Sequence, residues 1–347
     1  MAGEPKAKVI PLHSNSSRSS AARRASAARA ESSRRHPSLL TDSGGRASAE
    51  QIAAVVREID QRRSAAAGTP TVEETPSELA KRIASVAEFI RKRMTGDYTV
   101  DEFGFDPHLN DAIFLPLLRV FFNSWFRVEV SGIENLPRTG AALVVANHAG
   151  VLPFDGLMTA VAVHDKHPTH RDLRLLAADM VFDMPMLGQA ARKAGHTMAC
   201  TADAHRLLAA GELTAVFPEG YKGLGKHFKD RYKLQRFGRG GFVSAAIRAQ
   251  VPIIPVSIVG SEEIYPLIAK APALARALGV PYFPVTPLFP WFGVLGLIPL
   301  PSKWIIEFGD AITTDELPPG AADDPMVVGA GAAGAAVLVG RTVWRKR

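Results

Sequence analysis

Two residues that could share a proton during catalysis stand in the segment from Asn147 to Gly156, NHAGVLPFDG. His148 could accept the proton of an attacking hydroxyl, and Asp155 could fix the tautomer of the imidazole and stabilise its charged form. The segment follows an apolar run, and residues at the carboxyl end of a strand face the crevice where ligands bind. A histidine that only caps a strand would fit this segment alone equally well.

A second polar segment, VFPEGYKG at residues 216–223, also follows an apolar run. Glu219 and the Gly220 backbone could orient an acceptor hydroxyl or a polar headgroup, and Lys222 offers a cation for a phosphate. Taken by itself, the segment fits a solvated turn better than a site.

The elements that must position these segments indicate an α/β domain. Apolar runs typical of strands alternate with helical patterns, so we expect a mostly parallel mixed sheet, buried on both faces and flanked by helices. Pro252 and Pro255 are expected to rule out a regular central strand over their own positions. The strand-like runs span 126–132, 141–147, 173–179, 213–218, 253–259 and 304–309, and the helical patterns span 153–165, 183–194, 202–210 and 240–250.

Other segments surround this domain, which we expect to span 128–317. Residues 1–75 are rich in Ser, Ala and Arg, which predicts a disordered basic tail. Residues 76–127 predict an amphipathic helix and then a strongly apolar one, interrupted by Pro116, which either lies in the membrane interface or docks on the core. Residues 318–347 hold a Gly/Ala run that favours neither helix nor strand and predicts a C-terminal tail.

Apolar and basic composition limits the classes of protein that fit. The chain has 347 residues, of which 47% are hydrophobic, and its one cysteine excludes an intramolecular disulfide. A reducing compartment and a protein without a secretory signal are expected. The net charge of +7 suits anionic lipid or nucleic acid. The run at 279–301 is long and apolar but rich in proline, so it contacts lipid, lines an acyl channel or is buried.

Two further patterns, one like a phosphate-binding loop and one like a metal site, match those kinds of site poorly. The run at 220–226 has the spacing of a phosphate-binding loop, but His227 stands where such a loop needs Ser or Thr. Three histidines at 164–170 cluster beside Pro168, where we expect a solvated loop and no metal site.

In their order and separations, the segments at His148, at Glu219 and at 251–256 resemble the glycerolipid acyltransferase family, whose members acylate lysophosphatidic acid (1-acylglycerol-3-phosphate) and other glycerolipids. The resemblance spans about residues 128–309. It implies that His148 is the base and Asp155 its orienting acid, with no acyl-enzyme, metal or cofactor. It also implies that the Pro-Glu-Gly motif helps to hold the acceptor. The candidate substrate-binding residues are Asn147, Pro218, Glu219, Gly220 and Lys222.

Two departures from the family pattern bear on the acceptor. Six residues, where the family has four, separate His148 from Asp155, which resembles the branch of monoacylglycerol and diacylglycerol acyltransferases. Cys200 stands where the family's second motif ends in an arginine that binds the acceptor phosphate. A less charged acceptor, or a phosphate held by Lys222 and Lys226, is therefore expected.

The expected protein is an acyltransferase of phospholipid or neutral lipid synthesis. Its donor would be acyl-CoA or an acyl carrier protein, and its acceptor a lysophospholipid or another glycerolipid. We expect it at the cytoplasmic face of the cell membrane as a peripheral or monotopic protein, in contact with anionic lipid and not with nucleic acid. The alternative is a non-catalytic membrane- or nucleic-acid-binding protein that acts through its basic tail.

Overall fold

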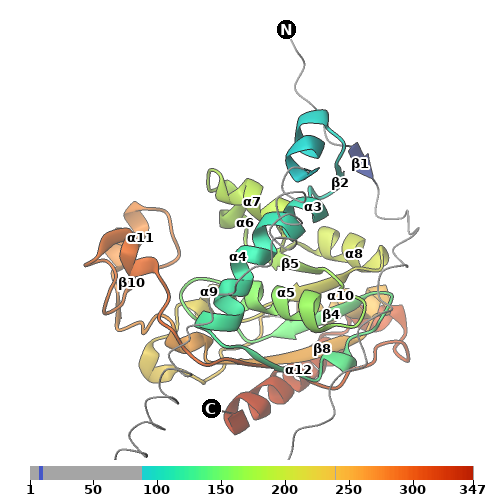
Figure 1. The fold of residues 1–347 in the computed structure, drawn as a ribbon. Coiled ribbons are helices and arrows are strands. Elements are labelled where there is room, and N and C mark those ends of the chain that lie inside the picture. Colours follow the sequence, from blue (N-terminus) through green and yellow to red (C-terminus); the bar gives the residue numbers. More distant parts are fainter. Residues whose placement is uncertain (1–7, 11–87, 239, 347) are drawn as a thin grey trace, which may run out of the picture. The chain divides into compact units, whose positions relative to one another are not determined.

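The computed structural model describes residues 8–10, 88–238 and 240–346, and its centre is a seven-stranded sheet (Figure 1). The strand order is β3-β11-β8-β4-β7-β5-β6, and neighbouring strands are parallel except β11 and β8. The predicted mostly parallel α/β fold is confirmed. The strands are β3 (Glu129–Ser131), β4 (Ala142–Ala146), β5 (Leu173–Ala177), β6 (Thr197–Met198), β7 (Leu213–Val216), β8 (Ile253–Val259) and β11 (Ile305–Phe308).

Helices cover both faces of this sheet, which explains why its central strands β4 and β8 are almost entirely apolar. In β4, Val144 belongs to the core shared with α5, and its neighbour Val145 belongs to the core shared with α10 and α12. The sheet therefore buries both sides of its central strands. The first face carries α4 (Leu115–Val120) and α5 (Phe154–Lys166), and the second carries α8 (Thr201–Ala209), α10 (Gly241–Ala249) and α12 (Pro325–Lys346).

Short elements fill the connections between these strands and helices. The short elements are α6 (Asp179–Asp183), α7 (Leu187–Lys193), α9 (Gly220–Leu224), and the 3-10 turns η3 (Ile133–Asn135), η4 (Phe228–Asp230), η5 (Ser261–Glu263) and η7 (Pro319–Asp323). Of these, α9 packs against the residues that follow β4.

Pro255 lies inside the central strand β8, so the expectation that it interrupts a regular strand is wrong. Ile253 donates its N–H to Ile312, and the N–H that Pro255 lacks would point to the same side. On that side Ile253 pairs with Ile312, and Val256 pairs with Phe308. The chain after β11 therefore has one residue more than β8 between these two pairs, which makes a bulge. A proline is tolerated there because the ladder needs no donor from it.

The apolar segment before β3 is a series of short helical pieces. Pro116 has no N–H to give, and π-helical turns lie on both sides of the piece it begins. Leu115 and Phe122 are buried in the core, whereas Leu117 and Val120 are exposed. One face of this segment therefore packs on the core, and the other exposes apolar side chains to solvent. The pieces are α3 (Pro107–Leu109), η1 (Asn110–Phe114), α4 and η2 (Phe121–Trp125).

The Gly/Ala-rich C-terminal segment forms the long helix α12, contrary to its composition. Val339 and Val343 are buried, and Ser257 of β8 donates a hydrogen bond to the Val339 carbonyl. Gly340 leaves room for the side chain of Leu234, because a Cβ at position 340 would lie only 2.8 Å from it. Close packing on the sheet thus outweighs the weak intrinsic propensity. In the described part of the chain, α12 is the helix that is long and apolar enough to cross a membrane.

Little of the predicted N-terminal region falls within the described residues. Lys8–Ile10 form β1, which pairs in parallel with β2 (Thr99–Asp101). Residues 88–95 are helical, in agreement with the end of the expected amphipathic helix. The predicted basic tail otherwise lies outside the described residues.

A lobe of residues 264–301 leaves the sheet between β8 and β11 and stands beside it in Figure 1, in orange. It contains a small antiparallel pair and two short helical pieces. Its elements are β9 (Ala269–Lys270), α11 (Pro272–Ala277), β10 (Pro284–Val285) and η6 (Gly293–Leu297).

Removal of two methyl groups from the buried side of α12 tests whether this helix is part of the core. Val339→Ala should lower the free energy of unfolding by about 1–3 kcal/mol, because it leaves a cavity against β8. The exposed Val337→Ala is the matched control and should change it by less than about 0.5 kcal/mol. Urea unfolding followed by circular dichroism measures both, and equal effects of the two changes would contradict the docked helix.

Candidate active site

The two residues predicted to share a proton are in direct contact. His148 follows β4 at the carboxyl edge of the sheet, and Asp155 lies in the first turn of α5. His148 Nδ1 is 2.7 Å from Asp155 Oδ2, with the aspartate side chain 0% and the histidine side chain 11% exposed. A buried carboxylate at Nδ1 keeps the ring proton on that atom, so Nε2 presents its lone pair. The pair has the geometry of a general base with an orienting acid.

Backbone donors hold the Asp155 carboxylate in place. Oδ2 also accepts a hydrogen bond from the Ala149 N–H at 2.8 Å, and Oδ1 accepts one from the Gly156 N–H at 2.8 Å. The N-terminal turn of a helix further favours a negative charge. The carboxylate is therefore fixed from three directions before any substrate binds.

The loop between the two residues turns back sharply, which allows them to meet across six intervening residues. Gly150 and Val151 have positive φ angles of 98° and 61°. A Cβ at Gly150 would lie 2.6 Å from the Ser261 carbonyl oxygen, so only glycine fits. The Val151 N–H donates to Leu224, and the Tyr282 hydroxyl donates to the Val151 carbonyl at 2.7 Å. The six residues between His148 and Asp155 therefore form a loop with a defined conformation, held by contacts to the rest of the domain.

Glu219 holds the backbone of His148. One carboxylate oxygen accepts a hydrogen bond from the His148 N–H at 2.9 Å, and the other accepts one from the Gln235 N–H at 2.6 Å. Lys226 lies 3.5 Å from Glu219 and 2.8 Å from Glu262. Burial raises the pKa of Glu219, and the charge of Lys226 opposes that shift. Both oxygens are already engaged, so the geometry favours a positioning role over the predicted acceptor binding.

Asn147, the other polar residue of the first motif, is engaged with the backbone of β8. It is buried, its side-chain amide donates to the Ile258 carbonyl at 2.8 Å, and its oxygen accepts from the Ile258 N–H at 2.8 Å. The side chain thus joins the ends of β4 and β8 where their ladder stops. This arrangement favours a structural role, and the role of Asn147 in substrate binding stays a prediction.

Three predicted residues lie in or beside α9, which packs directly on His148. A Cβ at Gly223 would be 2.4 Å from the His148 carbonyl oxygen. Lys222 is exposed and has no ion-pair partner among the residues that the structure describes. Pro218 lies in the turn that precedes the helix, Gly220 is the first residue of the helix, and both are partly exposed. This cation therefore remains free for a ligand, whereas Lys226 does not.

Sequence reasoning missed the residues that support the histidine from outside the motifs. Phe217 packs against the imidazole, with ring centroids 4.7 Å apart. Gln235 and Tyr282 come from distant segments and carry no local signal. Phe217 could have been found, because it directly precedes the Pro-Glu-Gly motif. Cys200 caps α8, where its sulfur accepts from the Asp203 N–H.

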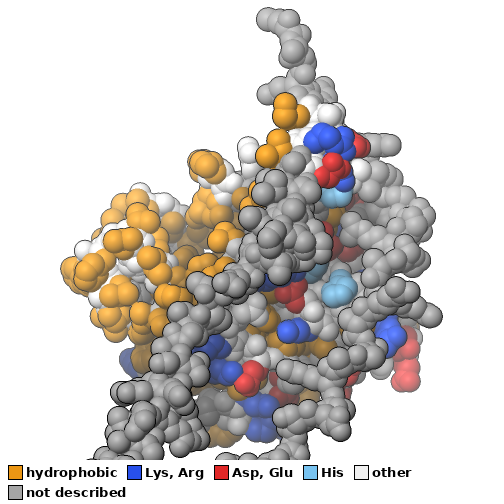
Figure 2. Space-filling model, viewed as in Figure 1, with side chains coloured by type: hydrophobic (Ala, Val, Ile, Leu, Met, Phe, Trp, Pro, Cys, Tyr) orange, Lys and Arg blue, Asp and Glu red, His pale blue; other side chains and the backbone are white. Residues whose placement is uncertain are grey.

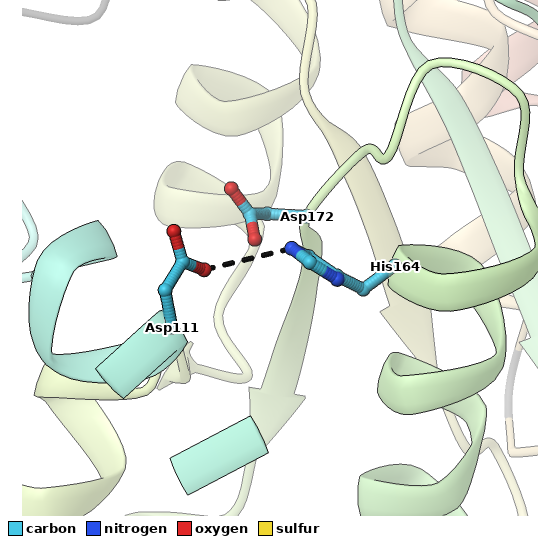
Figure 3. Close-up of side chains that lie close together, drawn as sticks. All are labelled: Asp111, His164 and Asp172. Carbon is cyan, nitrogen blue, oxygen red and sulfur yellow. Dashed lines mark ion pairs between the residues drawn. The ribbon is translucent and has the colours of Figure 1, made fainter. Parts of the chain in front are cut away.

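A second polar cluster joins η1 to the C-terminal end of α5 (Figure 3). Asp111, His164 and Asp172 offer ligand atoms within 4.8 Å of one another. His164 lies 3.5 Å from Asp111 and 3.2 Å from Asp165, which in turn binds Arg119 at 2.6 Å. Arg119 thus balances Asp165, and His164 adds a second positive charge when it is protonated. The cluster is a network of ion pairs, and His164 is helical instead of lying in the expected solvated loop.

Comparisons with known proteins agree with the motifs. The family model Acyltransferase matches residues 127–259. An uncharacterized protein of Mycobacterium tuberculosis is 71% identical over 328 residues, which cover 94% of this chain and 91% of that protein. A Bos taurus protein named DGAT1/2-independent enzyme synthesizing storage lipids is 30% identical over 138 residues, 38% of each chain.

Among solved structures, the 1-acyl-sn-glycerophosphate acyltransferase PlsC from Thermotoga maritima is similar, with a TM-score of 0.43 and 18% identity. The match covers 69% of this chain and 82% of that one. The family expected from the motifs is confirmed by the family model, and the matched residues include His148, Asp155 and Glu219.

The positioning role of Glu219 predicts a specific kinetic defect. Glu219→Gln places an amide N–H₂ against one of two backbone donors, so the His148 loop should shift. We expect kcat to fall by about tenfold or more while the KM for the acceptor changes little. Lys222→Ala should do the opposite and raise KM. A raised KM with normal kcat in Glu219→Gln would assign this carboxylate to acceptor binding.

His164 predicts a pH-dependent contribution to stability. The hydrogen bond to Asp111 raises the pKa of His164 in the folded protein. Its stabilisation is therefore complete below the ordinary pKa of about 6.5 and is lost as the pH rises through the higher folded value.

The difference in Tm between the unaltered protein and His164→Gln should shrink as the pH rises from about 6 to about 9. Differential scanning fluorimetry measures it, with the exposed His205→Gln as control. A difference that stays constant over this range would show that the ion pairs do not depend on the imidazolium.

Proposed function

We propose, since this chain belongs to the acyltransferase family, that it transfers a fatty acyl group from a thioester to the hydroxyl of a glycerolipid. The observation that carries the proposal is the contact of His148 Nδ1 with buried Asp155 at the carboxyl edge of the sheet. This contact leaves His148 Nε2 as a base at the place where ligands bind in an α/β fold.

The proposed reaction is a direct transfer between donor and acceptor. His148 Nε2 removes the proton from the acceptor hydroxyl as its oxygen attacks the thioester carbonyl carbon. The carbon–sulfur bond then breaks, and the leaving thiolate takes the proton from His148, which yields an ester and a free thiol. Asp155 stabilises the imidazolium that exists between these two transfers. General-base help of this kind is worth roughly 10²–10⁴-fold in rate.

The loop amides beside His148 point to a donor for the tetrahedral oxyanion. Three of the four N–H groups at 148–151 are taken, by Glu219, Asp155 and Leu224. The Gly150 N–H has no acceptor among the described residues. We assign it to the developing negative charge, where one such donor contributes about 10²–10³-fold in kcat.

The acceptor is proposed to be a glycerolipid with little or no phosphate charge. Lys226 is buried between Glu219 and Glu262, which leaves Lys222 as the exposed cation on α9. Cys200, in place of the arginine expected from the family, supplies no cation either. The name of the Bos taurus relative, which refers to storage lipids, supports the same direction. 1-Acylglycerol-3-phosphate is the charged candidate to compare.

The donor is proposed to be acyl-CoA or an acyl carrier protein, with no further cofactor. The site of action is proposed to be the cytoplasmic face of the cell membrane, with the protein bound as a peripheral or monotopic one. Exposed apolar side chains on the segment at 107–125 support this placement. The alternative of a non-catalytic binder that acts through its basic tail does not explain the buried Asp155 or the engaged Glu219.

One substitution separates the enzyme from the tail-driven binder. His148→Ala should abolish acyl transfer without unfolding the protein, because the ring is partly exposed and its backbone contacts remain. Purified protein would be assayed with acyl-CoA and lysophosphatidic acid, other lysophospholipids, monoacylglycerol and glycerol 3-phosphate.

The exposed His205→Ala is the control and should keep full activity. Faster transfer to monoacylglycerol than to lysophosphatidic acid would support the weakly charged acceptor. Near-normal turnover in His148→Ala would refute the proposed base.

A further inference from the structure

The tip of the lobe at 264–301 exposes a group of large apolar side chains. Trp291 is 71% exposed, Val294 81% and Leu295 68%. Figure 2 shows hydrophobic side chains covering this part of the molecule. A water-soluble surface rarely gathers so many large apolar groups without a partner. The other exposed apolar residues of the lobe are Ile268, Leu274, Leu278, Phe292 and Ile298.

The charges of the lobe restrict the kind of partner that fits. The sequence contains no Asp or Glu from residue 264 to residue 306. Within the lobe the charged residues are Lys270 and Arg276, and both are exposed. An apolar tip with basic and no acidic residues matches an anionic bilayer, whose headgroups attract cations and whose interior accepts the apolar groups.

Trp125 joins the lobe to the helical segment at 107–125, which also has exposed apolar side chains. Trp125 is exposed in part, and its indole N–H donates to the Pro299 carbonyl at 2.8 Å. Tryptophan suits the membrane interface because its ring is apolar and its N–H is polar. Leu117 and Val120 on the same helical segment are also exposed.

The base of the lobe contacts the catalytic loop. The Tyr282 hydroxyl donates to the Val151 carbonyl at 2.7 Å, and its ring lies against Gly225, which follows α9. Tyr282 and the buried Tyr265 thus connect the exposed tip to the loop between His148 and Asp155. A lipid that leaves a bilayer at the lobe would reach the edge of the sheet where the base lies.

From these observations we infer that the lobe docks on an anionic lipid bilayer, with Trp291, Val294 and Leu295 entering its apolar layer. Lys270 and Arg276 contact the headgroups. The docking rests on the proposed function, because it brings a bilayer-borne acceptor to His148. It assigns membrane binding to the lobe and not to the exposed face of α12.

The test compares two pairs of apolar-to-acidic changes in the full-length protein. Trp291→Glu with Leu295→Glu places two charges at the lobe tip, and Val337→Glu with Leu338→Glu places two on the exposed face of α12. Cosedimentation with phosphatidylcholine vesicles that contain phosphatidylglycerol measures binding. The lobe pair should weaken binding about tenfold or more, and the α12 pair should not. Lys270→Ala with Arg276→Ala should weaken binding only when phosphatidylglycerol is present.

Acyl transfer to a short-chain acceptor that is soluble as a monomer separates this inference from the proposed function. The lobe pair should keep this activity while it loses vesicle binding. Full vesicle binding by the lobe pair, loss in the α12 pair alone, or conversion of an oligomer to a monomer by the lobe pair would each overturn the inference. The last result would mean that the tip joins two copies of the chain. Absence of transfer by the unaltered protein would refute the proposed function and leave the binding result intact.

Discussion

The buried carboxylate of Asp155 is the interaction on which the site depends. It accepts hydrogen bonds from Ala149 and Gly156 and contacts His148 Nδ1 at 2.7 Å, so it ties the end of β4 to the start of α5. A charge removed from water is costly unless several donors satisfy it. The loop between His148 and Asp155 has positive φ angles at Gly150 and Val151. The hydrogen bonds to the Asp155 carboxylate, together with the one from the Tyr282 hydroxyl to the Val151 carbonyl, hold it in this conformation.

Most of the polar side chains near the histidine are already engaged with other groups of the chain. Glu219 holds the His148 N–H, Lys226 balances Glu219 and Glu262, and Asn147 joins two strand ends. Such a preorganised frame costs no rearrangement when the reaction begins. We therefore propose that recognition of the acceptor falls to groups outside the frame, among them the exposed Lys222.

Apolar surface is divided between the core and the outside in an unusual way. The strands bury both faces, and α12 closes one of them with small residues that allow close approach. The helical segment at 107–125 and the lobe instead dock by one face and leave another open. The buried apolar residues of the sheet and its helices thus stabilise the fold, whereas we infer that the exposed apolar residues of the lobe contact lipid.

The sequence by itself determined the α/β class and the positions of the main strands along the chain, and it predicted that His148 and Asp155 act together, because apolar periodicity and motifs are local properties. It did not determine that Pro255 lies in a central strand or that residues 325–346 form a helix, since a bulge on the neighbouring strand and packing on β8 decide these. Only the tertiary structure showed that the polar atoms of Glu219 and Asn147 already have partners within the chain, which favours a positioning role for both. Their partners, Gln235 and Ile258, come from distant parts of the chain, and a buried polar atom takes whichever partner the fold brings to it.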